Sequence, residues 1–336
     1  MNKSLLILIL SLISIKSFSQ ADSVKQYVDS ALVILKKNSL YSKKVDWKSV
    51  EKKVKEKSKT IKTKAKTFEA LKIAFNALGD RHAAYYQYED QYKLENPKLN
   101  VRISDSLKAG WKRGLKIDNR MIGDVAYISI PTLGVGKQTD IDKYGNWIYD
   151  AVNKLNDKNP KGWIIDLRMD GGGNIRPMLG GLAMFFKDGI YTYYIDKDGK
   201  SSDESGFRDG DFVMDGKIQA NIKNKMKSIN NAKVAILIGP GTASSGEGVA
   251  VVFSQRENTK SFGTDSAGLA NTTNGFVFNH NLSYFLISVG KIADKNKKLY
   301  PEIVMPDVYV KENESFGNLS NDPAVREAIK WLTSSK

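Results

Sequence analysis

The sequence has 336 residues, enough for one large hydrophobic core with a smaller domain attached to it. It contains no cysteine, which excludes a disulfide framework, a cysteine nucleophile and a thiolate metal site, and predicts no lipoprotein anchor. Lysine and arginine number 52 against 37 aspartates and glutamates, a net charge of +15 at neutral pH. Such an excess is compatible with anionic partners, so its distribution along the chain decides what it means.

The N-terminal residues MNKSLLILILSLISIKSFSQ predict a secretory signal peptide over residues 1–19. A lysine precedes an apolar run from Leu5 to Ile15, and Ser17 and Ser19 stand where small residues precede a cleavage site. The apolar run is too short for a stable membrane span. We therefore expect an exported protein, either secreted or periplasmic.

The positive charge is concentrated in Lys48–Lys66, KSVEKKVKEKSKTIKTKAK, where lysines alternate with acidic and sparse apolar residues. Removing the signal peptide with its two lysines leaves 50 basic against 37 acidic residues, or +13. The alternation is typical of a solvated helix face. We expect no nucleic acid among the partners of an exported chain with this pattern.

Helical periodicity dominates the beginning of the mature chain. Apolar residues recur at helical spacing in Asp22–Lys37, Val45–Lys57 and Thr67–Leu78, and the last of these segments ends at Gly79. The sequence predicts a helical N-terminal domain over residues 20–85, followed by a polar and irregular linker over residues 86–120.

From residue 121 onward, strand and helix patterns alternate. The apolar runs VAYISIP, GWIIDLR and VAILI are separated by helical patterns at Ile141–Leu155 and Met178–Phe186. This order predicts an α/β core over residues 121–336, with a largely parallel sheet covered by helices. Tyr191–Phe212 predicts a β-rich excursion, and Asp322–Leu332 predicts a closing helix with a proline at its first position.

The stretch Val234–Glu247, VAILIGPGTASSGE, predicts a buried strand, a sharp break and a helix that opens on two serines. In α/β proteins, ligands collect at this edge of the sheet. Ser244 and Glu247 also spell a capping box, so the same residues predict either an ordinary helix start or a nucleophilic serine. The second interpretation requires a base and backbone N–H donors for an oxyanion.

The segment Asp170–Asn174, DGGGN, follows another predicted strand and allows three interpretations. It can be a tight turn that lets a helix approach the sheet, an oxyanion hole made of backbone N–H groups, or a phosphate cradle. The phosphate cradle is disfavoured because Arg176 stands where G-x-G-x-x-G needs a glycine, and because G-x-x-x-x-G-K-[ST] is absent.

Only two histidines offer an imidazole base. His82 follows a predicted helix at the end of the N-terminal domain, in a loop of the kind that carries functional groups. His280 lies in a turn between two strand-like runs, and we expect it to be structural. His82 is therefore the candidate base.

Five segments, in this order, resemble the C-terminal processing (tail-specific) serine peptidases with their tricorn-core and retinoid-binding-protein relatives. LGDRH at Leu78–His82 resembles the family's L-x-D-x-H-[ST], VAYISIP its first core strand, and IIDLRMDGGGN its D-L-R-x-N-x-G-G turn. GTASSGE resembles the nucleophile turn S-A-[SG]-E, and VMPDVYV the late x-P-D-[IV]-x-V. The resemblance covers most of the mature chain and implies a crotonase-like layered core and a serine endopeptidase.

The resemblance also implies a site, residue by residue. Ser244 matches the nucleophile, and the backbone N–H groups of Ser245 and Gly172 match the oxyanion donors. His82 matches the base of the tricorn-like branch, and Glu302 lies near the glutamate that supports the base there. Peptides or unfolded proteins would be the substrates, and no metal or cofactor is implied.

Three departures from the family pattern bear on which branch of the family this sequence resembles. Leu269 stands 25 residues after Ser244, where lysine-using members have their base, so we expect no Ser-Lys dyad. Arginine and alanine flank His82, so the supporting hydroxyl of the tricorn-like branch is missing. The 42 residues between His82 and Val125 leave no room for a PDZ domain.

The alternative to an enzyme is a catalytically silent member that binds peptides or apolar ligands, as some relatives do.

Overall fold

The computed structural model describes residues 23–112, 114, 116–311 and 314–334, so the predicted signal peptide lies outside the described residues. The chain divides into two compact units. The first unit comprises the residues up to Glu95 together with Thr273–Gly290, and the second comprises Asn96–Thr272 and Lys291–Lys336. The domain limits predicted from the sequence stay predictions. No helix within the described ranges is long and apolar enough to cross a bilayer.

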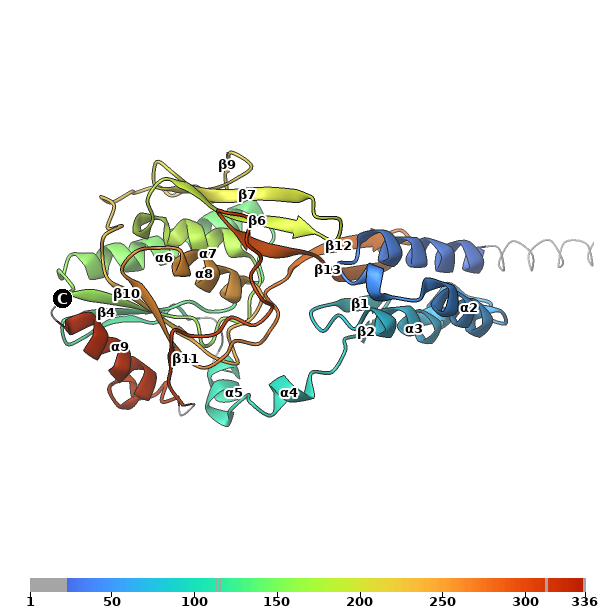
Figure 1. The fold of residues 1–336 in the computed structure, drawn as a ribbon, viewed down its shortest axis with the longest axis horizontal. Helices are drawn as coiled ribbons and strands as arrows, with labels where there is room; N and C mark the ends of the chain where they lie inside the picture. The colour runs from blue at the N-terminus through green and yellow to red at the C-terminus, as the bar shows by residue number, and fades with distance from the viewer. Residues whose placement is uncertain (1–22, 113, 115, 312–313, 335–336) are drawn as a thin grey trace, which may run out of the picture. The chain divides into compact units, whose positions relative to one another are not determined.

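The first unit surrounds its own hydrophobic core with amphipathic helices and short strands (Figure 1). The helices form because their apolar residues recur every three or four positions, as Val50 and Val54 do in α2, and this places them on one buried face. Strand β13 pairs antiparallel with β1 and brings Phe285 and Ile287 into the same core. The elements are a helix over 23–38, η1 (Ser42–Lys44), α2 (Trp47–Ser58), η2 (Lys64–Thr67), α3 (Phe68–Leu78), β1 (Ala84–Gln87), β2 (Asp90–Tyr92), β12 (Thr272–Phe278) and the first part of β13 (Ser283–Asp294).

A six-stranded sheet forms the centre of the second unit, in the order β14-β11-β10-β5-β4-β3. Its pairs are parallel except for the edge pair of β3 with β4, which confirms the largely parallel sheet predicted from the alternating pattern. The strands are β3 (Asn119–Ile122), β4 (Val125–Ser129), β5 (Gly162–Asp166), β10 (Val234–Ile238), β11 (Thr259–Gly263) and β14 (Val308–Tyr309).

Helices cover both faces of this sheet, as Figure 1 shows. Alternate residues of β4 and β5 point to opposite sides, so Ile128 and Ile165 pack with helices α6, α7 and α8, whereas Tyr127 and Ile164 pack with helix α9. The helices are α6 (Gln138–Asn156), α7 (Ile175–Gly181), α8 (Ser245–Ser254) and α9 (Pro323–Thr333). Pro323 is the first residue of α9, as the sequence predicts.

The remaining elements of the second unit include a difference from the sequence prediction. The β-rich excursion is present as the antiparallel strands β6 to β9. The stretch predicted to be irregular, however, contains two short helices, and burial of Leu107 holds one of them. These elements are α4 (Pro97–Asn100), α5 (Asp105–Lys112), η3 (Ala183–Phe185), β6 (Gly189–Asp196), β7 (Ser201–Arg208), β8 (Asp211–Met214), β9 (Lys217–Ile218) and η4 (Leu319–Asn321).

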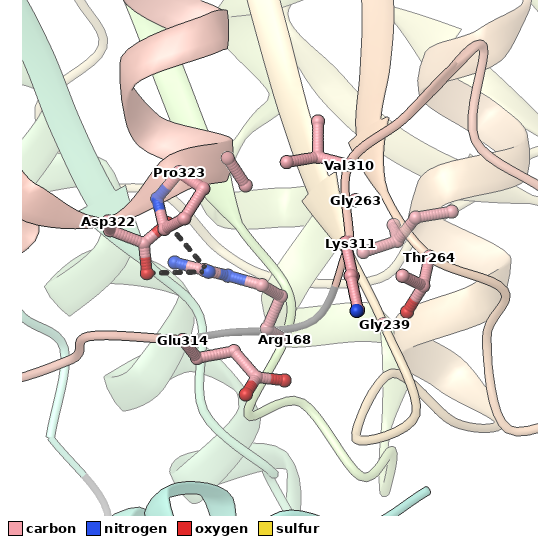
Figure 2. A pocket seen from close by; sticks show the side chains of 11 residues that line it. Arg168, Gly239, Gly263, Thr264, Val310, Lys311, Glu314, Asp322 and Pro323 are labelled. Atoms are coloured by element: carbon pink, nitrogen blue, oxygen red, sulfur yellow. Dashed lines mark hydrogen bonds and ion pairs between the residues drawn. The ribbon is translucent and has the colours of Figure 1, made fainter.

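The arginine of the D-L-R motif has a structural role. Arg168 is buried, and its guanidinium donates to Asp166 at 2.7 Å and to both carboxylate oxygens of Asp322 at 2.9 and 3.0 Å. Asp322 also accepts the N–H of Val325 at the start of α9. Figure 2 shows Arg168 and Asp322 joined by hydrogen bonds in the wall of a pocket of only about 10 Å³, which has room for about one water molecule. This pocket is too small for a peptide side chain, and the ion pairs hold α9 to the sheet.

Candidate functional site

Ser244 occupies a strained turn between β10 and α8. It is the N-cap of α8 and has φ +54° and ψ −115°, a conformation that side-chain-bearing residues seldom adopt. Such strain costs about 1–3 kcal/mol, and it persists where the surrounding contacts determine the backbone. The turn therefore has both properties that the sequence left as alternatives, since it begins a helix and also presents a serine in a strained position.

The glycine turn lies directly against this serine. Gly172 has φ +100°, and a Cβ atom added to it would lie 2.7 Å from the Cβ of Ser244 and 2.9 Å from the carbonyl oxygen of Ala243. The N–H of Ala243 donates to the carbonyl oxygen of Asp170 at 2.9 Å. Only glycine allows this approach, because any side chain at position 172 would separate the two turns.

Asp170 is a site residue that the sequence analysis did not single out. It is fully buried, its Oδ1 accepts the N–H of Gly172 at 2.9 Å, and its Oδ2 has no hydrogen-bond partner among the described residues. A side chain on Gly246 would lie 2.5 Å from the carbonyl oxygen of Asp170. Burial raises the pKa of Asp170 well above its usual range. The sequence signal was an aspartate where the family pattern has asparagine.

Ser245 provides a further contact between the serine turn and the glycine turn. Its hydroxyl donates to the carbonyl oxygen of Gly173 at 2.8 Å. As the first residue of α8, Ser245 has an N–H that no earlier helical carbonyl can accept, and the helix dipole adds partial positive charge there. The backbone of Ser245 is thus suited to stabilise a negative charge beside Ser244.

Glu247 connects the nucleophile turn to a second loop. It is fully buried, and its Oε2 accepts the N–H groups of Ser244 at 2.7 Å and Leu269 at 3.0 Å. Its Oε1 accepts the hydroxyl of Ser266 at 2.5 Å and the N–H of Gly268 at 2.8 Å. Burial raises the pKa of Glu247 to about 7, although these hydrogen bonds lower it. The capping interpretation of Glu247 accounts for only one of its contacts.

Glu302 belongs to the segment that borders this loop. The N–H of Ala270 donates to the carbonyl oxygen of Glu302 at 3.2 Å, and Ser266 exchanges hydrogen bonds with the backbone of Val304. The N–H of Leu269, where the sequence resemblance would place a lysine base, donates to Glu247 at 3.0 Å. This loop therefore supplies backbone contacts to the serine turn.

His82 and His280 both belong to the first unit, whereas the serine turn, the glycine turn and Glu302 belong to the second. His82 follows α3, and its N–H donates to Asp80 Oδ1 at 3.0 Å. Asp80 also accepts the N–H and the hydroxyl of Ser288, which fixes the loop to β13, and burial raises the pKa of Asp80. His280 lies in the turn between β12 and β13, with φ +53°. The pairing of His82 with Ser244 stays a prediction.

Gly172→Ala is expected to reduce turnover about a hundredfold or more. The added Cβ would overlap Ser244 and Ala243, so the serine must move by a substantial fraction of an ångström, which is enough to misplace a reacting group. The measurement is the rate of hydrolysis of a short peptide at saturating concentration.

Gly199→Ala is the matched control for backbone strain. Gly199 has φ +80°, but a Cβ there would have no neighbour within 4 Å. Both variants carry alanine at positive φ, and only the first meets the serine turn. Equal losses of turnover in the two variants would show that strain, and not contact with Ser244, causes the effect.

Glu247→Gln is expected to lower both stability and turnover although the side chain keeps its size. Each carboxylate oxygen accepts a backbone N–H, so an amide must turn its NH₂ toward at least one donor and leave it unpaired, at a cost of about 1–3 kcal/mol. Urea denaturation measures the free energy of unfolding of each protein.

The pH dependence of this difference follows from the raised pKa of Glu247. The folded protein retains the proton up to about pH 7, whereas the unfolded chain loses it near the ordinary value of 4.5. The unfolded state then binds fewer protons, so the stability of the wild type falls relative to the glutamine variant as pH rises from about 4.5 to about 7. If the difference in free energy of unfolding between the wild type and Glu247→Gln stays constant from about pH 4.5 to about pH 7, the raised pKa of Glu247 is contradicted.

Similar proteins match nearly the whole length of this chain. A nisin-resistance protein of Lactococcus lactis subsp. lactis is 26% identical over 313 residues, which are 93% of this chain and 88% of that protein. A lipoprotein structure from Streptococcus agalactiae is 23% identical with a TM-score of 0.68, and the match covers 92% of this chain and 96% of that one. The photosystem II D1 C-terminal processing protease is 12% identical with a TM-score of 0.56, covering 90% and 97%.

The two structures share the fold, a mixed α/β architecture of helices and two sheets. The family is shown by a separate match over residues 124–310, which contain the glycine turn, the serine turn and the loop bound by Glu247. The resemblance drawn from five motifs is thereby confirmed, and the chain belongs to peptidase family S41.

Proposed function

We propose that this protein is a serine endopeptidase that cleaves peptides or unfolded proteins through Ser244. The observation that carries the proposal is the approach of the two turns, which holds a strained serine against Gly172 at the start of a helix. A purely structural helix start needs neither the positive φ of Ser244 nor a side-chain-free partner beside it. Membership of a peptidase family supports the same reaction class.

In the proposed reaction, Ser244 Oγ attacks the carbonyl carbon of the scissile bond while His82 takes the hydroxyl proton. The tetrahedral intermediate carries its negative charge on the former carbonyl oxygen, and the N–H groups of Ser245 and Gly172 stabilise it. Collapse breaks the C–N bond, and the amine leaves with the proton from His82. Water then hydrolyses the acyl-enzyme, with His82 again taking and returning a proton. Glu302 is proposed to orient His82.

Asp170 affects how the Gly172 N–H can serve as an oxyanion donor. That N–H donates to Asp170 Oδ1, so an oxyanion has to compete with the carboxyl group for it. The raised pKa of Asp170 favours its neutral form, and a neutral acid is a weaker acceptor than a carboxylate. A neutral Asp170 would therefore hold Gly172 in position and still release its N–H to a developing negative charge.

The proposed place of action is outside the cytoplasm, in the periplasm or the medium. The predicted signal peptide supports export, and the similar chains include a lipoprotein and a nisin-resistance protein. We also propose the crotonase-like layering for the core, with the helical N-terminal domain ahead of it.

The test is hydrolysis of an unfolded protein by the purified mature chain, followed by mass spectrometry of the products. New termini inside the substrate, absent when Ser244→Ala replaces the wild type, are the expected result. If varied unfolded substrates all stay intact while peptides bind, the protein is a silent member of the family. The arginine and alanine beside His82 are the sequence features that would then explain the loss of activity.

A further inference from the structure

A pocket of about 760 Å³ opens in the second unit next to the glycine turn. Pockets that bind drug-sized ligands have volumes of about 300–1,000 Å³, so this one can hold a large side chain with part of its backbone. Its walls are mainly apolar, and they come from α5, the segment between α5 and β3, β3, β4, the segments that follow β4 and β5, and the chain before α9. These apolar wall residues are Trp111, Ile117, Ile130, Pro131, Met169 and Phe316.

The pocket reaches the nucleophile turn through the backbone. Gly171 lines it, and the Gly171 N–H donates to the hydroxyl of Thr132, another lining residue, at 2.8 Å. The next residue, Gly172, is the one that lies against Ser244. The Gly171–Gly172 backbone thus links the wall of the pocket to the serine turn, with the two contacts made by adjacent residues.

Most polar groups around the pocket are paired with protein atoms, whereas Lys116 contributes an exposed side chain to the rim. Trp111 Nε1 donates to the carbonyl oxygen of Met169 at 3.3 Å, and the Tyr127 hydroxyl donates to Asp166 at 2.8 Å. Arg120 and Asp118 at the rim form an ion pair at 2.6 Å. The charged groups stand at the rim and the interior walls are apolar, so contact with the apolar walls dominates recognition of a side chain that enters the pocket.

The aromatic walls are held in place by contacts with neighbouring residues. Phe316 lies over the guanidinium of the buried Arg168, with 5.0 Å from the ring centroid to Cζ. Trp111 is anchored by its indole N–H while 39% of its surface stays exposed. Preformed aromatic surfaces of this kind bind apolar side chains without first having to become ordered.

We propose that this pocket binds a large apolar or aromatic side chain of the substrate next to the scissile bond, and that Trp111 determines this specificity. That the ligand is a peptide substrate rests on the proposed function. That the site binds a large apolar group rests on the pocket alone. The protein then selects its cleavage site by a bulky apolar residue next to the scissile bond.

The experiment uses short unstructured peptides in which a single phenylalanine or alanine occupies each position around the scissile bond. At one position the wild type is expected to prefer phenylalanine by at least about tenfold in kcat/KM, the usual size of discrimination by an apolar pocket. Trp111→Ala is expected to remove most of that preference, mainly through a higher KM for the phenylalanine peptide.

Trp147→Ala is the matched control, because Trp147 on α6 is 51% exposed and lies outside the pocket. It is expected to keep the wild-type preference. Phe316→Ala removes a second aromatic wall of the pocket. It serves as the test variant if Trp111→Ala does not fold. A preference for phenylalanine that survives in both pocket variants would overturn the proposal.

Binding measurements separate this proposal from the proposed function. Calorimetry with the Ser244→Ala variant records affinity for the same peptides without cleavage. Tighter binding of the phenylalanine peptide that depends on Trp111 supports the pocket even if the wild type hydrolyses nothing, which would refute only the enzyme. Hydrolysis without any dependence on Trp111 refutes the pocket and leaves the enzyme standing.

Discussion

Ser244→Ala is expected to abolish hydrolysis, by a factor of at least about 1,000, and to leave the fold intact. Removing a nucleophile eliminates the covalent step, and the residual rate comes only from binding and the oxyanion donors. Alanine retains the Cβ that touches the glycine turn and the N–H that donates to Glu247. Rates with a peptide substrate and a thermal melt of each protein measure the two effects.

Ser245→Ala is the matched control for Ser244→Ala, because it removes the hydroxyl of the neighbouring serine instead. The adjacent serine loses its bond to the Gly173 carbonyl but keeps its backbone N–H, the only part of it assigned to the reaction. We expect a loss of activity of about tenfold at most. If Ser244→Ala cleaves as fast as the wild type, Ser244 is not the nucleophile. If it instead loses about 0.5–2 kcal/mol of stability, the serine serves as a helix cap.

His82→Gln is expected to remove most of the activity at every pH, whereas His280→Gln is expected to remove little. Only a neutral imidazole can accept the serine proton, so wild-type activity should rise with pH through an apparent pKa of about 6–7. Glutamine has no such titration and cannot act as a base. The measurements are pH profiles of kcat/KM for the wild type and both variants.

Glu247 titrates in the same pH range, so the wild-type profile alone does not identify the base. The variants do, because Glu247 is present in both of them. A greater loss from His280→Gln than from His82→Gln would refute the assignment of the base. The two histidines lie on different loops of the same unit, which makes this a comparison within one folded environment.

Local patterns in the sequence were sufficient to predict most of the central sheet and its helices, but not the edge strand β3, which begins in the predicted linker. Continuous apolar runs predicted β4, β5 and β10, apolar residues at spacings of three and four predicted α6, and α9 was predicted as a closing helix that begins at a proline. Helices α4 and α5 escaped prediction because they are short and because one buried leucine, Leu107, contributes much of the burial in α5. So few turns leave no periodicity to detect.

The candidate site was predicted only in part, since its decisive contacts join segments far apart in the chain. The motifs named Ser244 and Gly172, but no spacing rule could indicate that a Cβ on one would meet the Cβ of the other. Asp170 looked like a turn residue, and its burial with an unpaired oxygen depends on Gly246 packing over it. Glu247 had the signature of a cap, and its contacts with a loop about twenty residues later have no local signal.

The assignment of Thr273–Gly290 to the first unit has a consequence for the order in which the protein matures. A polypeptide leaves the ribosome, or a translocation channel, N-terminus first, so α2 and α3 emerge long before β13. Their apolar faces need Phe285 and Ile287 to complete the core, and these residues arrive only after most of the second unit has been made. Helices α2 and α3 therefore lack a complete hydrophobic core until β13 has been synthesised, and during that time they are exposed to proteases and to aggregation.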